Sequence, residues 1–260
     1  MSGPLSGQRI LVTRAREQAA ELSRRLVDLG ATVIEAPAIR FEDPPDWAPL
    51  DRALARLSTY AWIVFTSQNA VPRLLARMQA RGVDASALVG SRHAAIGEAT
   101  EAALRGAGLR CDLVADEYRA EAVAEALERE PLAGKRVLIP RALVARDVLP
   151  ERLTARGADV DVAPVYQTVA DLEGAEVARR ALSEGGVDVV TFTSTSTVRA
   201  FFFALRGADL SRVRLASIGP ITSDALRAEG WEPAVEASPY TVPALVEALA
   251  RHRAVGAEDR

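Results

Sequence analysis

The sequence is poor in the residues that most often carry metal, redox or disulfide chemistry. It has one cysteine, Cys111, and two histidines, His93 and His252, among 260 residues. A single cysteine cannot form an internal disulfide, and so few thiols and imidazoles predict no zinc cluster. We expect Cys111 to pack in a strand, His93 to be buried and structural, and His252 to be solvated. The low cysteine content favours a reducing, cytoplasmic environment.

Motifs for nucleotide binding, serine hydrolases and membranes are also missing. No G-x-G-x-x-G follows the first predicted strand, the segment before Lys135 is no P-loop, and no G-x-S-x-G is present. No apolar run reaches the length of a membrane span, which is about 18 residues, and the N-terminal MSGPLSGQR lacks the apolar core of a signal peptide. The formal net charge of −3 provides no general attraction for nucleic acid. The sequence therefore predicts a protein without cofactor, nucleic-acid partner or membrane segment.

What the sequence does contain is an internal repeat. Residues 7–14 (GQRILVTR) resemble residues 134–141 (GKRVLIPR), an offset of 134 − 7 = 127. The same offset relates 64–67 (VFTS) to 191–194 (TFTS), and it has become 122 at 95–97 (AIG), which match 217–219 (SIG). The repeat predicts a duplicated unit of roughly 125 residues.

Each repeat alternates strand and helix signals. The apolar run at 10–13 is typical of a strand buried on both faces, whereas Ala19, Leu22 and Leu26 recur at helical spacing. Further strands are expected near 32–34, 61–65, 93–96, 111–114, 136–139, 159–163, 187–192, 214–218 and 233–236, with helices near 70–81, 98–107 and 120–129. The alternation predicts an α/β fold of two flavodoxin-like, doubly wound lobes with parallel sheets.

Glycines, small hydroxyl side chains and arginines follow the predicted strands. Ligands of such folds bind beyond the carboxyl ends of the strands, where glycine permits close approach, helix N-termini attract anions and arginine matches carboxylate or phosphate. The segments therefore predict an anion-binding site. Its candidate residues are Arg14, Thr66, Ser67, Gln68, Asn69, Gly97, Arg141, Arg146, Thr193, Ser194, Thr195, Ser196, Gly219 and Thr222.

Helix capping is the alternative interpretation of these loops. Serine and threonine are ordinary N-caps, so capping alone explains any one loop, including the stretch TFTSTSTV at 191–198. The same combination at three strand ends of each repeat favours a ligand site. We expect some hydroxyls of TFTSTSTV to cap a helix and the others to face a ligand.

Six short segments recur in a fixed order and spacing: Thr13-Arg14, 64–67, 164–168 (PVYQT), Thr193-Ser194, 218–222 (IGPIT) and 236–241 (EASPYT). Together with the tandem repeat, they resemble the uroporphyrinogen-III synthase family over nearly the full chain. Ile221 departs from the family pattern, in which a second hydroxyl is often found.

The resemblance implies a topology that the periodicity does not show. The chain would cross twice between its lobes, near 37–41 and 164–168, through linkers that pair as a short ladder. One lobe would hold residues 1–37 and 166–260 and the other 38–165, with the active-site cleft between them. The periodicity alone favours one boundary near Pro131. The resemblance also implies a monomer.

The resemblance further implies a reaction. The family closes the linear tetrapyrrole hydroxymethylbilane to uroporphyrinogen III, with loss of water and inversion of ring D, through an azafulvene and a spiro intermediate and without a cofactor. It places Tyr166 at the cleft, as a proton donor or a group that orients the leaving hydroxide. Packing in the linker is the alternative for Tyr166.

Two other classes of protein compete with this interpretation. Fold and polar strand ends alone are compatible with a bilobal binding protein or sensor for a small polyanion. A nucleotide-dependent transferase is disfavoured by the missing phosphate loop.

Overall fold

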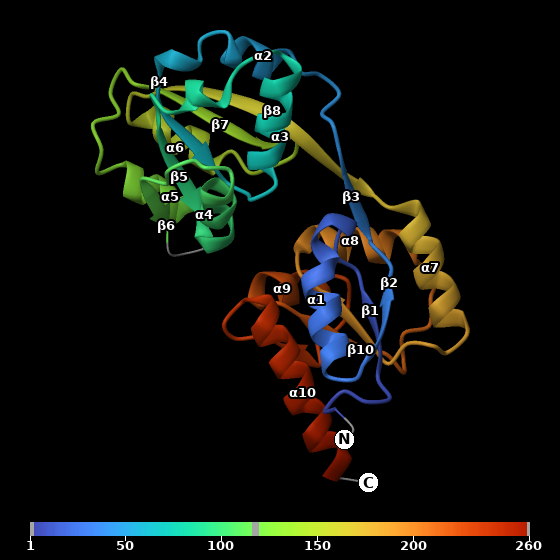
Figure 1. Ribbon diagram of the computed structural model, residues 1–260. Helices are drawn as coiled ribbons and strands as arrows, with labels where there is room; N and C mark the ends of the chain where they lie inside the picture. The colour runs from blue at the N-terminus through green and yellow to red at the C-terminus, as the bar shows by residue number, and fades with distance from the viewer. Residues whose placement is uncertain (1–2, 116–119, 259–260) are drawn as a thin grey trace. The chain divides into compact units, whose positions relative to one another are not determined.

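The chain divides into two compact units, Met1–Phe41 with Val169–Arg260 and Glu42–Thr168. The computed structural model describes residues 3–115 and 120–258 (Figure 1). The predicted lobes 1–37 with 166–260 and 38–165, and the cleft between them, stay a prediction. The single boundary near Pro131 is wrong, because helices on both sides of it, α5 (Ala120–Leu127) and α6 (Val148–Ala155), pack together inside the second unit.

The first unit is a doubly wound parallel sheet with helices on both faces (Figure 1). Its strand order is β11-β10-β9-β1-β2, and every pair is parallel. In β1, Ile10 and Val12 belong to a core cluster with α1 and α10, whereas Leu11 belongs to a cluster with α7, α8 and α9. The elements are β1 (Arg9–Val12), α1 (Arg16–Asp28), β2 (Thr32–Glu35), α7 (Leu172–Ser183), β9 (Val189–Phe192), α8 (Thr195–Ala204), β10 (Arg214–Ser217), α9 (Pro220–Ala228), β11 (Val235–Glu236) and α10 (Val242–Glu258).

The second sheet has the order β3-β8-β7-β4-β5-β6. Trp62 and Val64 of β4 belong to a core cluster with α5 and α6, and α3 and α4 pack against each other. Two 3₁₀ turns lie at Leu57–Thr59 and Ala85–Leu88. The remaining elements are β3 (Ile39–Glu42), α2 (Ala48–Leu54), β4 (Tyr60–Phe65), α3 (Ala70–Ala80), β5 (Arg92–Ile96), α4 (Gly97–Gly106), β6 (Leu113–Ala115), β7 (Arg136–Ala142) and β8 (Asp159–Ala170).

Strands related by the sequence repeat hold equivalent positions in the two sheets. β1 corresponds to β7, β2 to β8, β9 to β4, β10 to β5 and β11 to β6, and each set has the same spatial order. The two parallel α/β sheets predicted from the sequence are confirmed, whereas the duplication itself stays an inference from the sequence.

The direction of winding reverses between β1 and β9 in one sheet and between β7 and β4 in the other. Doubly wound sheets bind ligands beyond the carboxyl ends of the strands at such a switch point.

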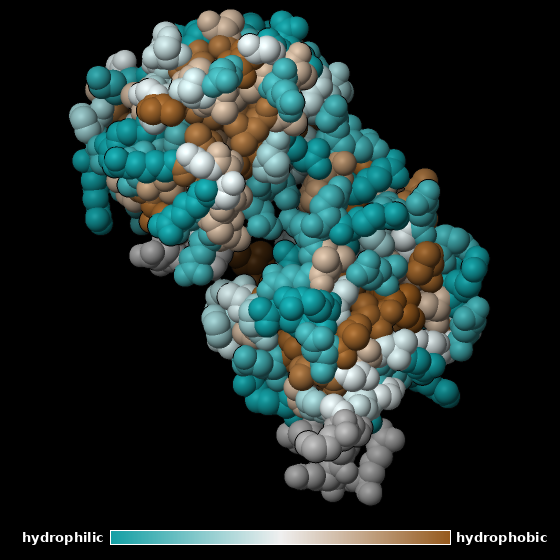
Figure 2. Space-filling view, viewed as in Figure 1, coloured by the Kyte–Doolittle hydropathy of each residue, from teal (hydrophilic) through white to brown (hydrophobic). Residues whose placement is uncertain are grey.

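Hydrophilic residues cover most of the face seen in Figure 2, with smaller hydrophobic areas between them. No helix within residues 3–115 and 120–258 combines the length and the apolar character that crossing a bilayer requires.

Candidate functional site

Arg14 lies at the switch point of the first sheet with its charge largely buried. Its Nε atom is buried and has no hydrogen-bond partner, and no ion pair of Arg14 is found among the described residues. Burial lowers the pKa of the Arg14 guanidinium from its usual value, and Glu21 offsets only part of this effect. Next to it, the Thr13 hydroxyl donates to the Thr191 carbonyl at 2.7 Å, which fixes the end of β1 to β9. Arg14 is therefore a cation whose charge the surrounding protein compensates only in part, without an ion pair.

The hydroxyls of TFTSTSTV divide into three groups, and the first is that of Thr191, which donates to the Leu11 carbonyl at 3.2 Å inside the sheet. Ser194 is the N-cap of α8 and accepts a hydrogen bond from the Thr197 amide at 3.2 Å. The Thr197 hydroxyl donates back to the Ser194 carbonyl at 2.7 Å. The side chains of Thr193, Thr195 and Ser196 make no hydrogen bond within the described part of the chain. N-capping of α8 therefore accounts for the Ser194 hydroxyl. A role of the Thr193, Thr195 and Ser196 hydroxyls in ligand binding stays a prediction.

We expect Ser194→Ala to lower the free energy of unfolding by about 0.5–2 kcal/mol, because it removes this N-cap. Ser196→Ala, at an exposed position without a hydrogen bond, is the matched control and should leave stability unchanged. Thermal unfolding of the two variants measures the difference. Equal melting temperatures would contradict the capping role of Ser194.

Most helices that follow strand ends lack a side-chain cap. The N-cap residues of α1, α3, α4 and α9 are Ala15, Asn69, Ile96 and Gly219, and none of them accepts a hydrogen bond from its helix through a side chain. The first-turn amides of a helix have no partner within the helix, and together with its dipole they favour an anion. These four N-termini are therefore suited to carboxylate binding.

The two candidate glycines are required for different reasons. Gly97 opens α4 with a φ of 72°, in the left-handed region where side chains are strained. Gly219 has extended backbone, but a Cβ there would lie 2.7 Å from Cδ1 of Tyr240, so a side chain would require the Tyr240 ring to shift. Thr222, also predicted as a ligand residue, is only 4% exposed in α9.

The second unit has a pocket of about 180 Å³ at its own switch point. The buried Arg141 donates from one terminal nitrogen to the Arg146 carbonyl at 2.9 Å and from the other to Asp147 Oδ1 at 2.5 Å. Its Nε is buried without a partner. The pocket thus combines donors with an apolar wall. Its lining includes Thr66, Arg141, Arg146, Ile96, Ile139 and Leu149.

The segment after β4 is compact and half-buried. The Ser67 hydroxyl accepts a hydrogen bond from the Asn69 amide at 3.2 Å, and the Ser67 carbonyl accepts one from the Ala70 amide at 3.0 Å. Thr66, Ser67, Gln68 and Asn69 all keep part of their surface exposed. The structure brings Thr66 together with Arg141 and Arg146 at one pocket.

Tyr166 lies in β8, beside the loop that leads out of β7. Its side chain is buried, with 5% exposure, and its carbonyl accepts a hydrogen bond from the Leu143 amide at 2.7 Å. The Arg73 guanidinium lies 5.5 Å from the centre of the Tyr166 ring, within range of a cation–π interaction. Arg73 was not identified from the sequence, because only the fold brings α3 to β8.

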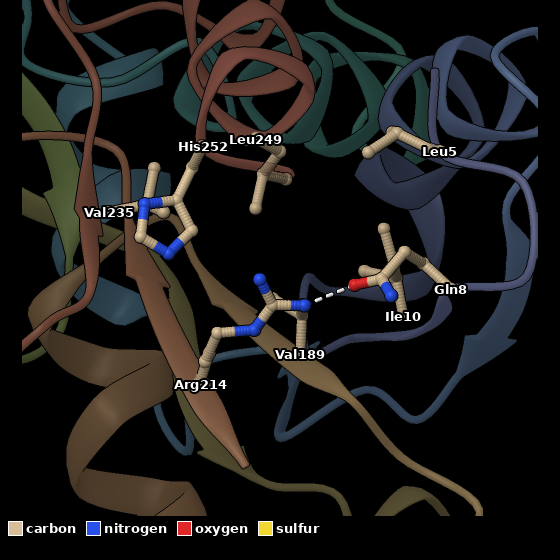
Figure 3. A pocket seen from close by; sticks show the side chains of 8 residues that line it. All are labelled: Leu5, Gln8, Ile10, Val189, Arg214, Val235, Leu249 and His252. Carbon is tan, nitrogen blue, oxygen red and sulfur yellow. Dashed lines mark hydrogen bonds between the residues drawn. The ribbon is translucent and has the colours of Figure 1, made fainter. Parts of the chain in front are cut away.

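A second pocket, shown in Figure 3, lies at the opposite edge of the first sheet. Gln8 and Arg214, joined by a hydrogen bond, line it near the amino ends of the strands together with the exposed His252. Its volume of about 10 Å³ is the space of one water molecule. It is therefore no substrate site.

His93 lies buried in β5, as predicted, whereas Cys111 precedes β6 and does not lie in a strand, contrary to the prediction. His93 is 2% exposed, and its Nδ1 lies 2.8 Å from the Arg110 carbonyl oxygen. Burial raises the pKa of the half-buried Cys111 thiol. No group of three or more His, Cys, Asp or Glu side chains that could hold a metal ion is found within the described ranges.

Fold and site define a two-unit α/β protein with donor-rich strand ends. Residues 20–247 match the family model for uroporphyrinogen-III synthase HemD. The uroporphyrinogen-III synthase of Synechococcus elongatus is 33% identical, over 95% of this chain and 96% of its own length. That of Salmonella typhimurium is 32% identical, over 92% and 99%. The chain belongs to the uroporphyrinogen-III synthase family.

Solved structures share this fold. A mutant uroporphyrinogen III synthase of Thermus thermophilus superposes with a TM-score of 0.68 at 22% identity, covering 95% of this chain and 98% of that one. The uroporphyrinogen-III synthetase of Helicobacter pylori has a TM-score of 0.61 at 18% identity, covering 97% and 100%.

Proposed function

We propose that the chain converts hydroxymethylbilane into uroporphyrinogen III, closing the macrocycle with loss of water and inverting ring D. Family membership supports the reaction. The structural observation that carries it is the set of uncapped helix N-termini and arginines at the strand ends of both units. The substrate has eight carboxylates, and each charge-assisted hydrogen bond to one of them contributes about 1.5–3 kcal/mol.

The binding residues are those predicted from the strand ends. In the first unit, Arg14 supplies a cation, and the segments that contain Thr193–Ser196 and Gly219–Thr222 supply hydroxyls and backbone amides. In the second unit, Thr66–Asn69, Gly97 and Arg146 do so, and Arg141, also predicted as a ligand residue, lies at the same pocket. The protein acts as a cytoplasmic monomer without a cofactor.

Catalysis rests mainly on positioning and electrostatics. Loss of hydroxide from the substrate gives an azafulvene. The substituted carbon of ring D attacks this azafulvene and gives a spiro intermediate, which fragments and then closes again to the product. Hydroxymethylbilane also closes unaided, to the unrearranged isomer, so the enzyme must hold ring D in the geometry that leads to inversion. Tyr166 donates a proton to the departing hydroxide or orients it, and Arg73 packs over its ring.

Turnover with isomer analysis tests this function. The purified protein is mixed with hydroxymethylbilane, the products are oxidised, and the type I and type III isomers are separated by chromatography. We expect type III in the presence of the protein and type I in buffer alone. Only type I in both samples would reject the proposed reaction and leave a binding protein or sensor for a polyanion as the alternative.

We expect the protein to keep its full rate after treatment with a chelator and removal of nucleotides. The reason is that neither a phosphate-binding loop in the sequence nor a metal-binding cluster among residues 3–115 and 120–258 is found. The rate of type III formation before and after treatment is the measurement. A loss of rate that an added metal ion restores would contradict the cofactor-free mechanism.

A further inference from the structure

Arg14 and Arg141 are the same position of the sequence repeat, since 14 + 127 = 141. Each follows the apolar core of an equivalent strand, β1 or β7, at the switch point of its sheet. Within the described residues, the same atom, Nε, is buried without a hydrogen-bond partner in both side chains. The two arginines therefore begin from matching backbone positions.

Their electrostatic surroundings differ. Arg141 forms an ion pair with Asp147 at 2.5 Å and also binds the Arg146 carbonyl. The repeat places Ala20 at the position that corresponds to Asp147, since 147 − 127 = 20. Arg14 accordingly has no such anion, and no other described residue forms an ion pair with it.

The surroundings of Arg14 make its isolated charge costly. Burial disfavours the cation, the charge of Glu21 offsets only part of this effect, and the uncapped N-terminus of α1, which begins at Arg16, adds the positive end of a helix dipole. A carboxylate bound there would accept from Arg14 and from the first amides of α1. Arg141, by contrast, is already neutralised, and its contacts connect β7 to the loop 143–147.

We propose that the two repeat-equivalent arginines have divided their roles. Arg14 binds a carboxylate of the ligand directly. Arg141 is a positioning residue that, through Asp147, holds the loop 143–147 and with it Arg146 at the second unit's pocket. The identity of the ligand, a polycarboxylate tetrapyrrole, rests on the proposed function.

Binding of uroporphyrinogen III under anaerobic conditions, together with thermal unfolding, tests the role of Arg14. Arg14→Gln should weaken binding about tenfold, the effect of one lost charge-assisted contact, without lowering the melting temperature. Arg14→Met serves the same purpose should the glutamine variant fail to fold. Wild-type affinity in a folded Arg14 variant would overturn the direct role. Wild-type protein that does not bind the product would instead count against the proposed function.

Asp147→Asn distinguishes the two possible roles of Arg141 by the sign of its effect. The matched control is Glu151→Gln, which removes a nearby exposed negative charge on α6 without touching Arg141. If Arg141 acts through the loop, Asp147→Asn should bind the product about threefold more weakly than the control. Affinity equal to or tighter than that of the control would overturn the positioning role, because a released Arg141 would then be a ligand residue itself.

The loss of product affinity caused by Asp147→Asn should also depend on Arg146. In an Arg146→Gln background, Asp147→Asn should cause no further loss of affinity, since the residue whose position it fixes is already gone. The melting temperature should still fall, because Arg141 loses its ion pair in either background. A full additional loss of affinity would show that Asp147 acts on binding by another route and would overturn the proposal.

Discussion

Tyr166→Phe is expected to lower kcat about a hundredfold while leaving the affinity for uroporphyrinogen III nearly unchanged. A phenol that donates a proton to the leaving hydroxide acts chiefly in the transition state, and general acid catalysis contributes about 10²–10⁴-fold. The change removes one oxygen from a buried side chain and keeps the ring under Arg73. Steady-state turnover, with product binding measured separately, gives both quantities.

Tyr60→Phe is the matched control in the same unit. The Tyr60 hydroxyl donates to Asp161 at 2.6 Å, and burial, together with this hydrogen bond, raises the pKa of Tyr60 to about 12. Loss of the Tyr60 hydroxyl should lower the free energy of unfolding by about 1 kcal/mol and leave kcat unchanged. A Tyr166→Phe variant that folds and keeps the wild-type kcat would leave Tyr166 as a packing residue of β8.

The strands and their sheets could be predicted because burial on both faces leaves a local signature. Ile10, Leu11 and Val12 form one continuous apolar run, and the structure uses alternate members for its two core clusters. Helix α2 was missed. The sequence DPPDWAP around Trp47 favours turns, yet α2 forms there with Leu50 buried and with Asp51 bound through both oxygens to Arg77 of α3. Such distant contacts leave no local pattern.

The candidate site could be predicted only as residue types at strand ends. The repeat identified Arg14 and Arg141 and treated them as equals, because the difference between them depends on where the side chain of Asp147 points. Ser194 could not be told from Ser196 by sequence, although one caps α8 and the other is exposed. Arg73 contacts Tyr166 from a helix nearly a hundred residues earlier in the chain, which no motif indicates.

Gly174→Ala is expected to lower the free energy of unfolding by about 3 kcal/mol or more, the upper range for forcing extra atoms into a packed site. A Cβ at Gly174 would overlap the Pro37 carbonyl oxygen and lie 2.8 Å from the carbonyl carbon of Pro37. Both partners are backbone, so neither can move aside as a flexible side chain would. The Gly174 amide also donates to the N-cap Asp171 at 2.9 Å, which fixes the first turn of α7.

Gly106→Ala is the control for this prediction. Gly106 ends α4, and a Cβ there would meet nothing within 4 Å, so alanine should leave stability unchanged or raise it by up to about 1 kcal/mol. Thermal unfolding should therefore separate the two variants by roughly 10 °C. The Asp171 amide also donates to the Ala38 carbonyl at 3.0 Å, so the start of α7 is bound to residues 37–38 at two points. Equal melting temperatures would show that α7 does not dock on this segment, because no backbone rearrangement could admit the extra methyl group without breaking one of these contacts.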